Sequence, residues 1–350
     1  MQTYYKSLSE GAPARLERLF SEAGKVVVVT HVHPDGDALG SSFGLFHFLD
    51  SRAVPVDVVT LDPVPDTLAF ILDERAAEHH FVASENMAGA ESVLRSAGLL
   101  VCLDFPTFSR AGDGLGDILA GLRCRKVLVD HHLSPDRDAF DLVFSETGVS
   151  SASELLYWVL DAIGGVMPPE TARCLMAGMT TDTNNFANSV YPSTFDMASR
   201  LLRAGVDRNR IVTDLYHNYR EQRYRLMGYL LSEKMVISAQ GVAYMILDTD
   251  EMLRYDVREG DTEAFVNLPL GIDRVRMSIF LKRQDEGLFR VSIRSEEGVS
   301  ANLCARLHFH GGGHELAAGG RLYVPDDVKD AADAAAYIEK VTSEFLAGRD

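Results

Sequence analysis

Residues 30–42 of the chain read THVHPDGDALGSS and follow directly on the apolar run Lys25-Val26-Val27-Val28-Val29. A short continuous run of β-branched residues predicts a strand that is buried on both faces of a parallel sheet. Residues 38–49 have helical spacing, so the motif lies in a loop between a strand and a helix. Two histidines and two carboxylates are therefore expected at the carboxyl edge of a sheet, where open α/β folds bind their ligands.

The composition of this loop suits a metal site, although the same residue types also form ordinary solvated turns. Glycines at positions 36 and 40 let the backbone bend so that Asp35 and Asp37 converge on one point. Similar clusters close three other apolar segments, which favours the metal site over the turn. These are Leu99–Leu103 followed by Asp104, Lys126–Val129 followed by Asp130-His131-His132, and a predicted helix over residues 169–179 followed by Thr180-Thr181-Asp182-Thr183.

Carboxylates that are crowded at one edge repel one another and raise their own pKa values unless cations neutralise them. Mixed aspartate and histidine ligands suit Mn²⁺ or a similar first-row ion better than Ca²⁺ or a structural zinc. There are more ligands than one ion needs, so we expect a pair of divalent ions, roughly 3.5–4 Å apart as in two-metal hydrolases. The predicted chemistry is hydrolysis of a phosphoester or a phosphoanhydride.

The overall composition limits the class of protein. A chain of 350 residues, 46% of them hydrophobic, is long enough for two domains with separate cores. A net charge of −17 argues against coating long duplex nucleic acid but allows a short oligonucleotide or a nucleotide at a local basic site. The four cysteines are scattered without CxxC spacing, so neither a disulfide framework nor a zinc module is indicated.

No apolar run approaches the ~20 residues that a membrane span needs. We therefore expect a cytoplasmic protein without a membrane partner. The sequence leaves the oligomeric state open, a homodimer included.

The order of the predicted elements indicates two α/β domains. Strand-like runs at 56–61, 99–103 and 126–129 alternate with helical stretches at 38–49 and 152–163, which predicts a doubly wound parallel sheet over residues 1–195. Residues 196–237 are helical in pattern and rich in arginine, and we interpret them as a linker whose arginines lie on solvated helix faces. Residues 238–350 are expected to form a smaller α/β domain with a mixed sheet.

The predicted second domain contains one further motif. The run 274–281 alternates as a strand with one solvated face should. Residues 309–314 read FHGGGH, and three consecutive glycines would let backbone amides approach a phosphate as an anion-binding nest, or would form only a flexible connection. A helix is expected over residues 328–346.

Five motifs in this order resemble the DHH phosphoesterase superfamily with its DHH-associated C-terminal domain. They are HVHPDGDALGS at 31–41, the strand-end Asp104, DHH at 130–132, TTDT at 180–183 and GGGH at 311–314. The resemblance covers nearly the whole chain and is greatest to the bifunctional oligoribonuclease (nanoRNase) and pAp phosphatase branch.

The resemblance implies a role for each residue of these motifs. His31 and Asp35 would bind one ion, Asp37, His131 and Asp182 the other, and Asp104 would bridge both. His132 would face the reacting phosphoryl group, and Asp130 would orient a neighbouring imidazole. The residues expected to bind the substrate's terminal phosphate and nucleotide are Arg294, Ser295, Gly311, Gly312, Gly313 and His314.

The implied activity is hydrolysis of short oligoribonucleotides to 5′-mononucleotides, and of pAp to AMP and phosphate, by a hydroxide held at two divalent ions, expected to be Mn²⁺. The alternatives are a phosphodiesterase for the linear dinucleotide pApA, a pyrophosphate or polyphosphate hydrolase, and a nucleotide-binding regulator without catalysis. Two positions depart from the family pattern. His310 stands where many relatives carry a fourth glycine, and residues 184–187 read NNFA where relatives often have GSFR, so Ala187 removes an expected substrate contact.

Overall fold

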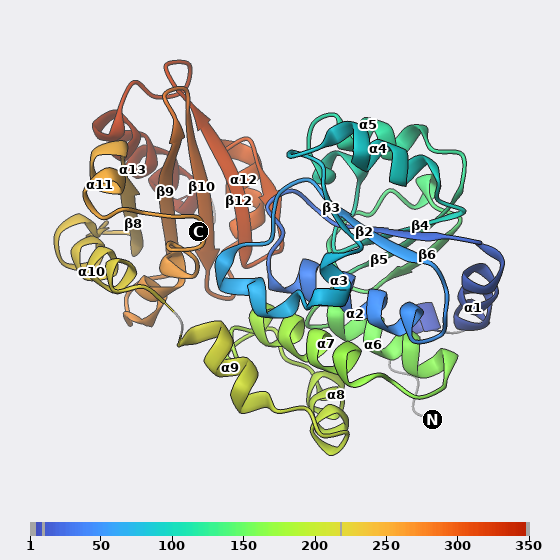
Figure 1. The fold of residues 1–350 in the computed structure, drawn as a ribbon. Coiled ribbons are helices and arrows are strands. Elements are labelled where there is room, and N and C mark those ends of the chain that lie inside the picture. The colour runs from blue at the N-terminus through green and yellow to red at the C-terminus, as the bar shows by residue number, and fades with distance from the viewer. Residues whose placement is uncertain (1–4, 9–10, 218, 348–350) are drawn as a thin grey trace. The chain divides into compact units, whose positions relative to one another are not determined.

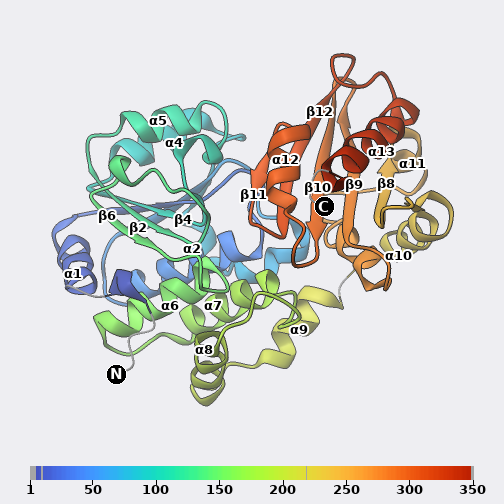
Figure 2. The same ribbon diagram turned by 180° about the vertical axis from the view of Figure 1, so that it is seen from behind.

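The computed structural model describes residues 5–8, 11–217 and 219–347, and it divides into two compact units, residues 1–218 and 219–350 (Figures 1 and 2). The division falls inside the stretch 196–237, for which the sequence predicts a linker. Helices α8 (Pro192–Arg203) and α9 (Arg208–Tyr216) belong to the first unit, and α10 (Glu221–Tyr229) belongs to the second.

The first unit is built on a six-stranded sheet in the order β3-β2-β1-β4-β5-β6. Every neighbouring pair is parallel, as the sequence predicts. The strand order reverses between β1 and β4, and such a switch point is where ligands bind in open α/β sheets. The strands are β1 (Val26–Val29), β2 (Val56–Thr60), β3 (His80–Val82), β4 (Leu99–Leu103), β5 (Arg125–Asp130) and β6 (Leu142–Ser145).

Helices cover both faces of this sheet, which explains why β1 is apolar at every position (Figure 1). Val26 and Val28 belong to one hydrophobic cluster, and Val27 and Val29 belong to another on the opposite face. The helices on the first face are α1 (Ala12–Glu22), α2 (Gly36–Asp50), the single turn α3 (Glu74–Ala77), α6 (Ala152–Ile163) and α7 (Pro169–Asp182), and those on the second are α4 (Met87–Arg95) and α5 (Leu115–Gly121).

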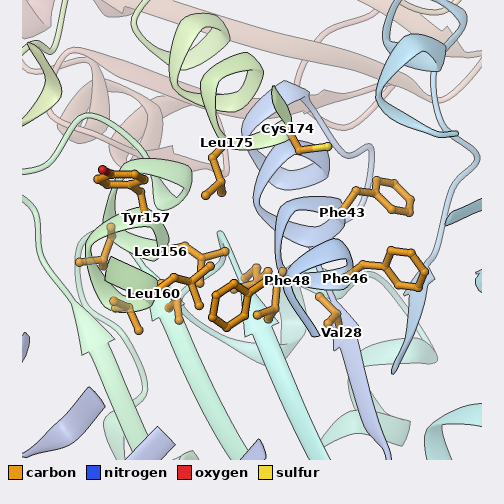
Figure 3. Close-up of a cluster of buried hydrophobic side chains, with 14 of the residues drawn as sticks. Val28, Phe43, Phe46, Phe48, Leu156, Tyr157, Leu160, Cys174 and Leu175 are labelled. Carbon is orange, nitrogen blue, oxygen red and sulfur yellow. The ribbon is translucent and has the colours of Figure 1, made fainter. Parts of the chain in front are cut away.

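Helix α2 lies at the centre of the first cluster and is buried along almost its whole length. Figure 3 shows its phenylalanines, Phe43, Phe46 and Phe48, in a cluster that includes Leu156 of α6 and Leu175 of α7. Glycines at positions 36, 40 and 44 recur every fourth residue and therefore form a stripe along one side of α2. A Cβ atom added to Gly40 would lie only 2.7 Å from the carbonyl oxygen of Cys174, so α2 and α7 touch backbone to backbone.

The second unit contains a mixed sheet in the order β11-β12-β10-β9-β8-β7, as the sequence predicts. Strands β8 and β9 are parallel, and the other neighbours are antiparallel. The strands are β7 (Val236–Ile237), β8 (Val242–Leu247), β9 (Met277–Asp285), β10 (Leu288–Ser295), β11 (Gly312–Gly313) and β12 (Ala317–Tyr323), and the helices besides α10 are α11 (Thr249–Arg254), α12 (Ala301–His308) and α13 (Ala331–Ala347).

Two expectations for this region are wrong. The strand expected over 274–281 has no solvated face, since residues 277–281 are all buried. Helices α12 and α13 cover one side of the sheet, while α10 and a 3₁₀ helix over Phe265–Gly271 cover the other. The arginines of the stretch 196–237 are not all solvated either. Arg223 is buried and donates hydrogen bonds to the carbonyl oxygens of Gly260, Asp261 and Glu263.

Within the part of the chain that the structure describes, no helix combines the length and the apolar character that crossing a membrane requires.

Candidate metal centre

The carboxyl ends of β1, β4 and β5 bring the predicted ligands of the first unit together. These three strands are neighbours in the sheet, so the residues that follow them meet at one edge. The Thr30 hydroxyl, directly after β1, donates a hydrogen bond to the carbonyl oxygen of Leu103 at the end of β4 (2.9 Å). This bond joins the two strand ends at the switch point.

Asp104 lies at the middle of the cluster and is almost completely buried. Its carboxylate oxygen Oδ2 is 3.5 Å from His31 Nε2, and Oδ1 is 3.3 Å from His131 Nε2. The backbone of Asp104 has a left-handed φ of 64°, a conformation that aspartate adopts more often than most residues other than glycine. This turn after β4 places one carboxylate between two imidazoles.

On one side of Asp104 lie His31 and Asp35, whose Nε2 and Oδ1 atoms are 3.9 Å apart. The His31 Nδ1 atom is 2.9 Å from the carbonyl oxygen of Val32, so its proton has an acceptor and Nε2 faces the carboxylates. Asp35 is the N-cap of α2, and its Oδ1 accepts hydrogen bonds from the amides of Asp37 and Ala38 (both 3.0 Å). The start of α2 therefore fixes the position of Asp35.

On the other side lie Asp37 and Asp182, whose Oδ2 atoms are 3.8 Å and 3.5 Å from His131 Nε2. Asp37 is fully buried, and its oxygens accept hydrogen bonds from the amides of Ala152 (2.6 Å) and Ser153 (2.9 Å) in the first turn of α6. A helix N-terminus is a favourable place for a carboxylate, because its backbone N–H groups have no partner within the helix.

This role of α6 was not predicted from the sequence. The signal that could have located it is Ser151 with Glu154 three residues later, a pattern typical of a helix start. Ser151 is indeed the N-cap of α6, and its hydroxyl accepts a hydrogen bond from the Glu154 amide (3.0 Å).

Asp182 is the last residue of α7, and the way this helix ends determines where the carboxylate lies. The amides of Asn185 and Asn184 donate to the carbonyl oxygens of Thr180 (2.8 Å) and Thr181 (2.9 Å), which is the hydrogen-bond pattern of a Schellman motif. Asn184 takes the left-handed position of this motif, with a φ of 46°. Asparagine tolerates that conformation, so the absence of a glycine here leaves the helix end intact.

The remaining residues of the two histidine motifs have separate contacts. His132 Nδ1 is 2.8 Å from Asp130 Oδ1. The imidazole next to Asp130, which we expected Asp130 to orient, is therefore that of His132. His33 lies beside Asp62, which accepts a hydrogen bond from its backbone amide (2.7 Å) and lies 3.3 Å from its ring nitrogen. His33 is thus a hydrogen-bonding residue of the loop.

The cluster perturbs the pKa values of its own members. Burial and the charges of Asp104 and Asp182 raise the pKa of Asp37, and burial raises the pKa of Asp182 to about 7 against the opposing charge of His131. Burial would lower the pKa of His31, but the nearby carboxylates of Asp104 and Asp35 raise it to about 9. The carboxylates around His131 raise its pKa against burial as well. Without a cation, the imidazoles of His31 and His131 therefore hold protons that metal binding would displace.

The donor set fits a pair of divalent ions. Three groups of three ligand atoms, each mutually within 4.8 Å, share Asp104, and two of them match the predicted ligands: His31 with Asp35, and Asp37 with His131. The third joins Asp104 to Asp130 and His132. The buried Asp104 Oδ1 accepts no hydrogen bond from the described residues, which leaves an acceptor that a cation would satisfy. Imidazole and carboxylate ligands together suit a first-row divalent ion.

In the second unit, the predicted substrate-binding residues lie on β10 and β11 or, for Gly311 and His314, directly beside β11. Arg294 on β10 is opposite Ala317 on β12, and β12 pairs in turn with β11, which contains Gly312 and Gly313. The Ser295 hydroxyl is buried and donates a hydrogen bond to the carbonyl oxygen of Val299 (2.5 Å). Ser295 therefore supports the local backbone in this structure.

The glycine run does not form an open nest of amides. The amide of Gly311 donates to Ala305 O (3.2 Å), that of Gly313 to Asn302 Oδ1 (3.0 Å), and that of His314 to Ala317 O (2.7 Å). A Cβ atom on Gly313 would lie 2.7 Å from the Ala317 carbonyl oxygen, so the run lies tightly against β12.

His310, the other departure from the family pattern, has a left-handed φ of 45°. This is a conformation that glycine adopts readily. The His310 ring lies 3.1 Å from Asp327 Oδ1.

Comparison with known proteins decides the family. The model of the DHH family N-terminal domain matches residues 25–179, and that of the DHHA1 domain matches residues 239–340. A bifunctional oligoribonuclease and PAP phosphatase of Thermus thermophilus is 31% identical over 87% of this chain and 86% of its own length. The chain belongs to the DHH family. DHH proteins are metal-dependent phosphoesterases, which agrees with the ligand cluster described above.

Two solved structures support the DHH fold. An exopolyphosphatase-related protein of Bacteroides fragilis is 34% identical, with a TM-score of 0.88 over 97% of both chains. RecJ of Thermus thermophilus in complex with Mn²⁺ is 16% identical, with a TM-score of 0.55 over 99% of this chain and 55% of that one. The second likeness concerns the fold alone.

Proposed function

We propose that this DHH protein hydrolyses short oligoribonucleotides to 5′-mononucleotides, and pAp to AMP and phosphate, with two Mn²⁺ ions. The observation that carries the proposal is the Asp104 carboxylate between His31 and His131 at the switch point of the sheet. With an imidazole beside each oxygen, this carboxylate could hold one ion together with His31 and a second with His131. Asp35 would complete one ion's ligands, and Asp37 and Asp182 the other's.

When bound, two such ions would polarise the phosphoryl oxygens and lower the pKa of the attacking water. The protein's own residues would then orient the reaction. Asp130 accepts the Nδ1 proton of His132, which fixes the orientation of the ring. We assign His132 to the reacting phosphoryl group, where it would pass a proton to the leaving oxygen.

The substrate class rests on the relatives and on the second unit. The Thermus thermophilus relative is described as acting on oligoribonucleotides and on PAP. In this chain Arg294 and the residues of 311–314 are the candidates for binding the terminal phosphate, because a guanidinium can bind phosphate oxygens in a bidentate manner. We further propose that residues 1–195 form the metal-binding domain, that residues 238–350 form the substrate-binding domain, and that residues 196–237 connect them.

A second substrate class has one observation in its favour. The Bacteroides fragilis structure at 34% identity carries the description "exopolyphosphatase-related". Polyphosphate is a chain of phosphoanhydrides, and the same pair of ions could act on it. It differs from oligoribonucleotides in lacking a base and a sugar.

Substrate profiling with purified protein tests the proposal. The protein is offered pAp, pApA, RNAs of two to seven nucleotides and polyphosphate, each with Mn²⁺, Mg²⁺ or Co²⁺, and released phosphate and mononucleotides are measured. Cleavage of the shortest RNAs together with pAp, fastest with Mn²⁺, is the expected result. Cleavage of polyphosphate alone would refute the nucleotide assignment, and binding of nucleotides without turnover under any metal would refute the enzymatic one.

A further inference from the structure

The loop that follows Asp182 has an unusual backbone. Asn184, Asn185 and Phe186 all have left-handed φ values, of 46°, 59° and 68°. Only the first of these is needed to end α7. Hydrogen bonds hold the other residues of the loop in place. The Thr183 hydroxyl oxygen accepts a hydrogen bond from the Phe186 amide (3.0 Å), and the Thr183 carbonyl oxygen accepts one from the Ala187 amide (2.9 Å). The loop is therefore fixed directly beside a candidate metal ligand.

An arginine side chain from another helix contacts this loop. Arg208, the first residue of α9, donates a hydrogen bond from Nη2 to Asn185 Oδ1. Its guanidinium also lies over the Phe186 ring, 5.3 Å from the ring centre. Phe195 of α8 stacks on Phe186 at 5.5 Å with an angle of 20° between the rings. The guanidinium is thus held in place by a hydrogen bond and a ring.

Arg208 differs from Arg200 and Arg210, its neighbours in the sequence, in having no ionic partner among the described residues. Among the described residues no carboxylate forms an ion pair with it, and Asn185 is its one hydrogen-bonded acceptor. By contrast, Arg210 on the same helix is paired with Asp214 (2.9 Å), and Arg200 of α8 with Asp161 (3.0 Å). A half-buried, oriented and unpaired guanidinium in a chain with a net charge of −17 is a candidate anion-binding group.

We propose that Arg208, held by Asn185 and Phe186, is a subsite for a phosphate of the nucleotide substrate that is not the one being hydrolysed. The guanidinium retains donors in a planar fork, which matches two phosphate oxygens. Asn185 follows Asp182 by three residues, so the cation is near the metal ligands without being one of them. The inference rests on the proposed function, because it concerns a second phosphate of that substrate.

Two phosphodiester substrates distinguish the effect of this subsite on activity from the effect of the metal centre. The dinucleotide pApA carries a second phosphate, whereas bis(4-nitrophenyl) phosphate has only the one that reacts. Loss of a charge-assisted contact changes affinity by roughly 10- to 100-fold. We therefore expect Arg208→Ala to lower kcat/KM for pApA by about that factor and to leave bis(4-nitrophenyl) phosphate within about twofold of wild type. Arg208→Lys should recover part of the loss, because it restores the charge without the fork.

Arg210→Ala is the matched control, since it removes an arginine of the same helix that already has a carboxylate partner, and it should behave as wild type with both diesters. Equal losses on both diesters in Arg208→Ala would mean that Arg208 only holds the loop of Asp182, and unchanged kinetics on both would mean that it does nothing for catalysis. Either result overturns the proposal.

A metal-free binding measurement keeps this inference separate from the proposed function. In buffer with EDTA, pAp is titrated into the wild-type protein and into Arg208→Ala, and calorimetry measures the binding. This experiment needs no turnover. Weaker binding by the variant supports the subsite even if the protein hydrolyses neither diester, in which case the proposed function fails by itself. Equal binding refutes the subsite.

Discussion

Replacing Gly40 by alanine should move the two halves of the metal centre apart. Gly40 lies on α2, a few residues after Asp35 and Asp37, and it faces α7, which carries Asp182 at its end. A Cβ atom at position 40 would lie 2.7 Å from Cys174 O and 2.8 Å from the Cα and N atoms of Gly178. All three are backbone atoms, so no side-chain rotation can relieve the contact.

The size of the effect follows from these distances. To restore an ordinary contact of 3.4 Å, α2 and α7 must separate by roughly 0.7 Å. Metal sites tolerate errors of only about 0.2 Å in ligand position, so Asp182 can no longer share an ion with Asp37 at its normal distance. Overpacking of this kind also costs about 1–3 kcal/mol of the free energy of unfolding. We expect Gly40→Ala to be folded but destabilised by that amount, with much weaker Mn²⁺ binding and little activity.

Two measurements check this prediction. Trp158 is the single tryptophan of the chain and is buried in the first unit, so its fluorescence during urea denaturation reports the unfolding of that unit. Calorimetry with Mn²⁺ gives the change in metal affinity. Gly121→Ala is the matched control, because it lies at the end of a helix of the same unit with no atom within 4 Å of the new Cβ. It should be neutral or slightly stabilising.

Wild-type stability and wild-type Mn²⁺ affinity in Gly40→Ala would refute the reasoning, since they would mean that the contact between α2 and α7 is looser than the structure shows. If Gly40→Ala were destabilised but bound Mn²⁺ as tightly as wild type, only one step would be refuted, namely that separating α2 from α7 displaces the metal ligands.

Three further predictions concern charge. Asp104→Ala should abolish hydrolysis and metal binding, because it removes a ligand that both ions would share, and the exposed Asp117→Ala should not; activity of Asp104→Ala in metal-defined buffer would exclude the two-ion assignment. Mn²⁺ binding at pH 7.5 should release roughly one proton each from His31 and His131, with the release declining as the pH is raised through the His31 pKa of about 9. Calorimetry in buffers of different ionisation enthalpy measures this release, and identical heats would contradict it. Burial lowers the pKa of His80 to about 4 from its ordinary 6.5, so the stability that its neutral form contributes is complete above pH 6.5 and is lost as the pH falls towards 4. His80→Gln should flatten this decline in the same tryptophan signal, and an unchanged pH profile would assign it to other groups.

The strands and helices around the metal centre could be predicted because their signals are local. The valine run of β1 and the apolar run of β4 are continuous, as strands buried on both faces must be. Other elements had no such signal. Strand β3 is three residues long and half-buried, and β12 begins with Ala-Ala-Gly-Gly, a sequence with low strand propensity. The buried strand β9 was expected to have a solvated face, because its alternating pattern does not reveal which helices cover it.

By itself, the sequence determined that aspartates and histidines follow the strands of a parallel sheet. That alone places them at one edge, since the carboxyl ends of parallel strands point the same way. Only the tertiary structure decided that Asp104 lies between His31 and His131, because this depends on β4 lying between β1 and β5. It also decided that the amides of α6 hold Asp37 and that Arg208 lies on the loop after Asp182. These contacts join residues far apart in the chain, and no local pattern of apolar and polar residues encodes which distant segment will approach.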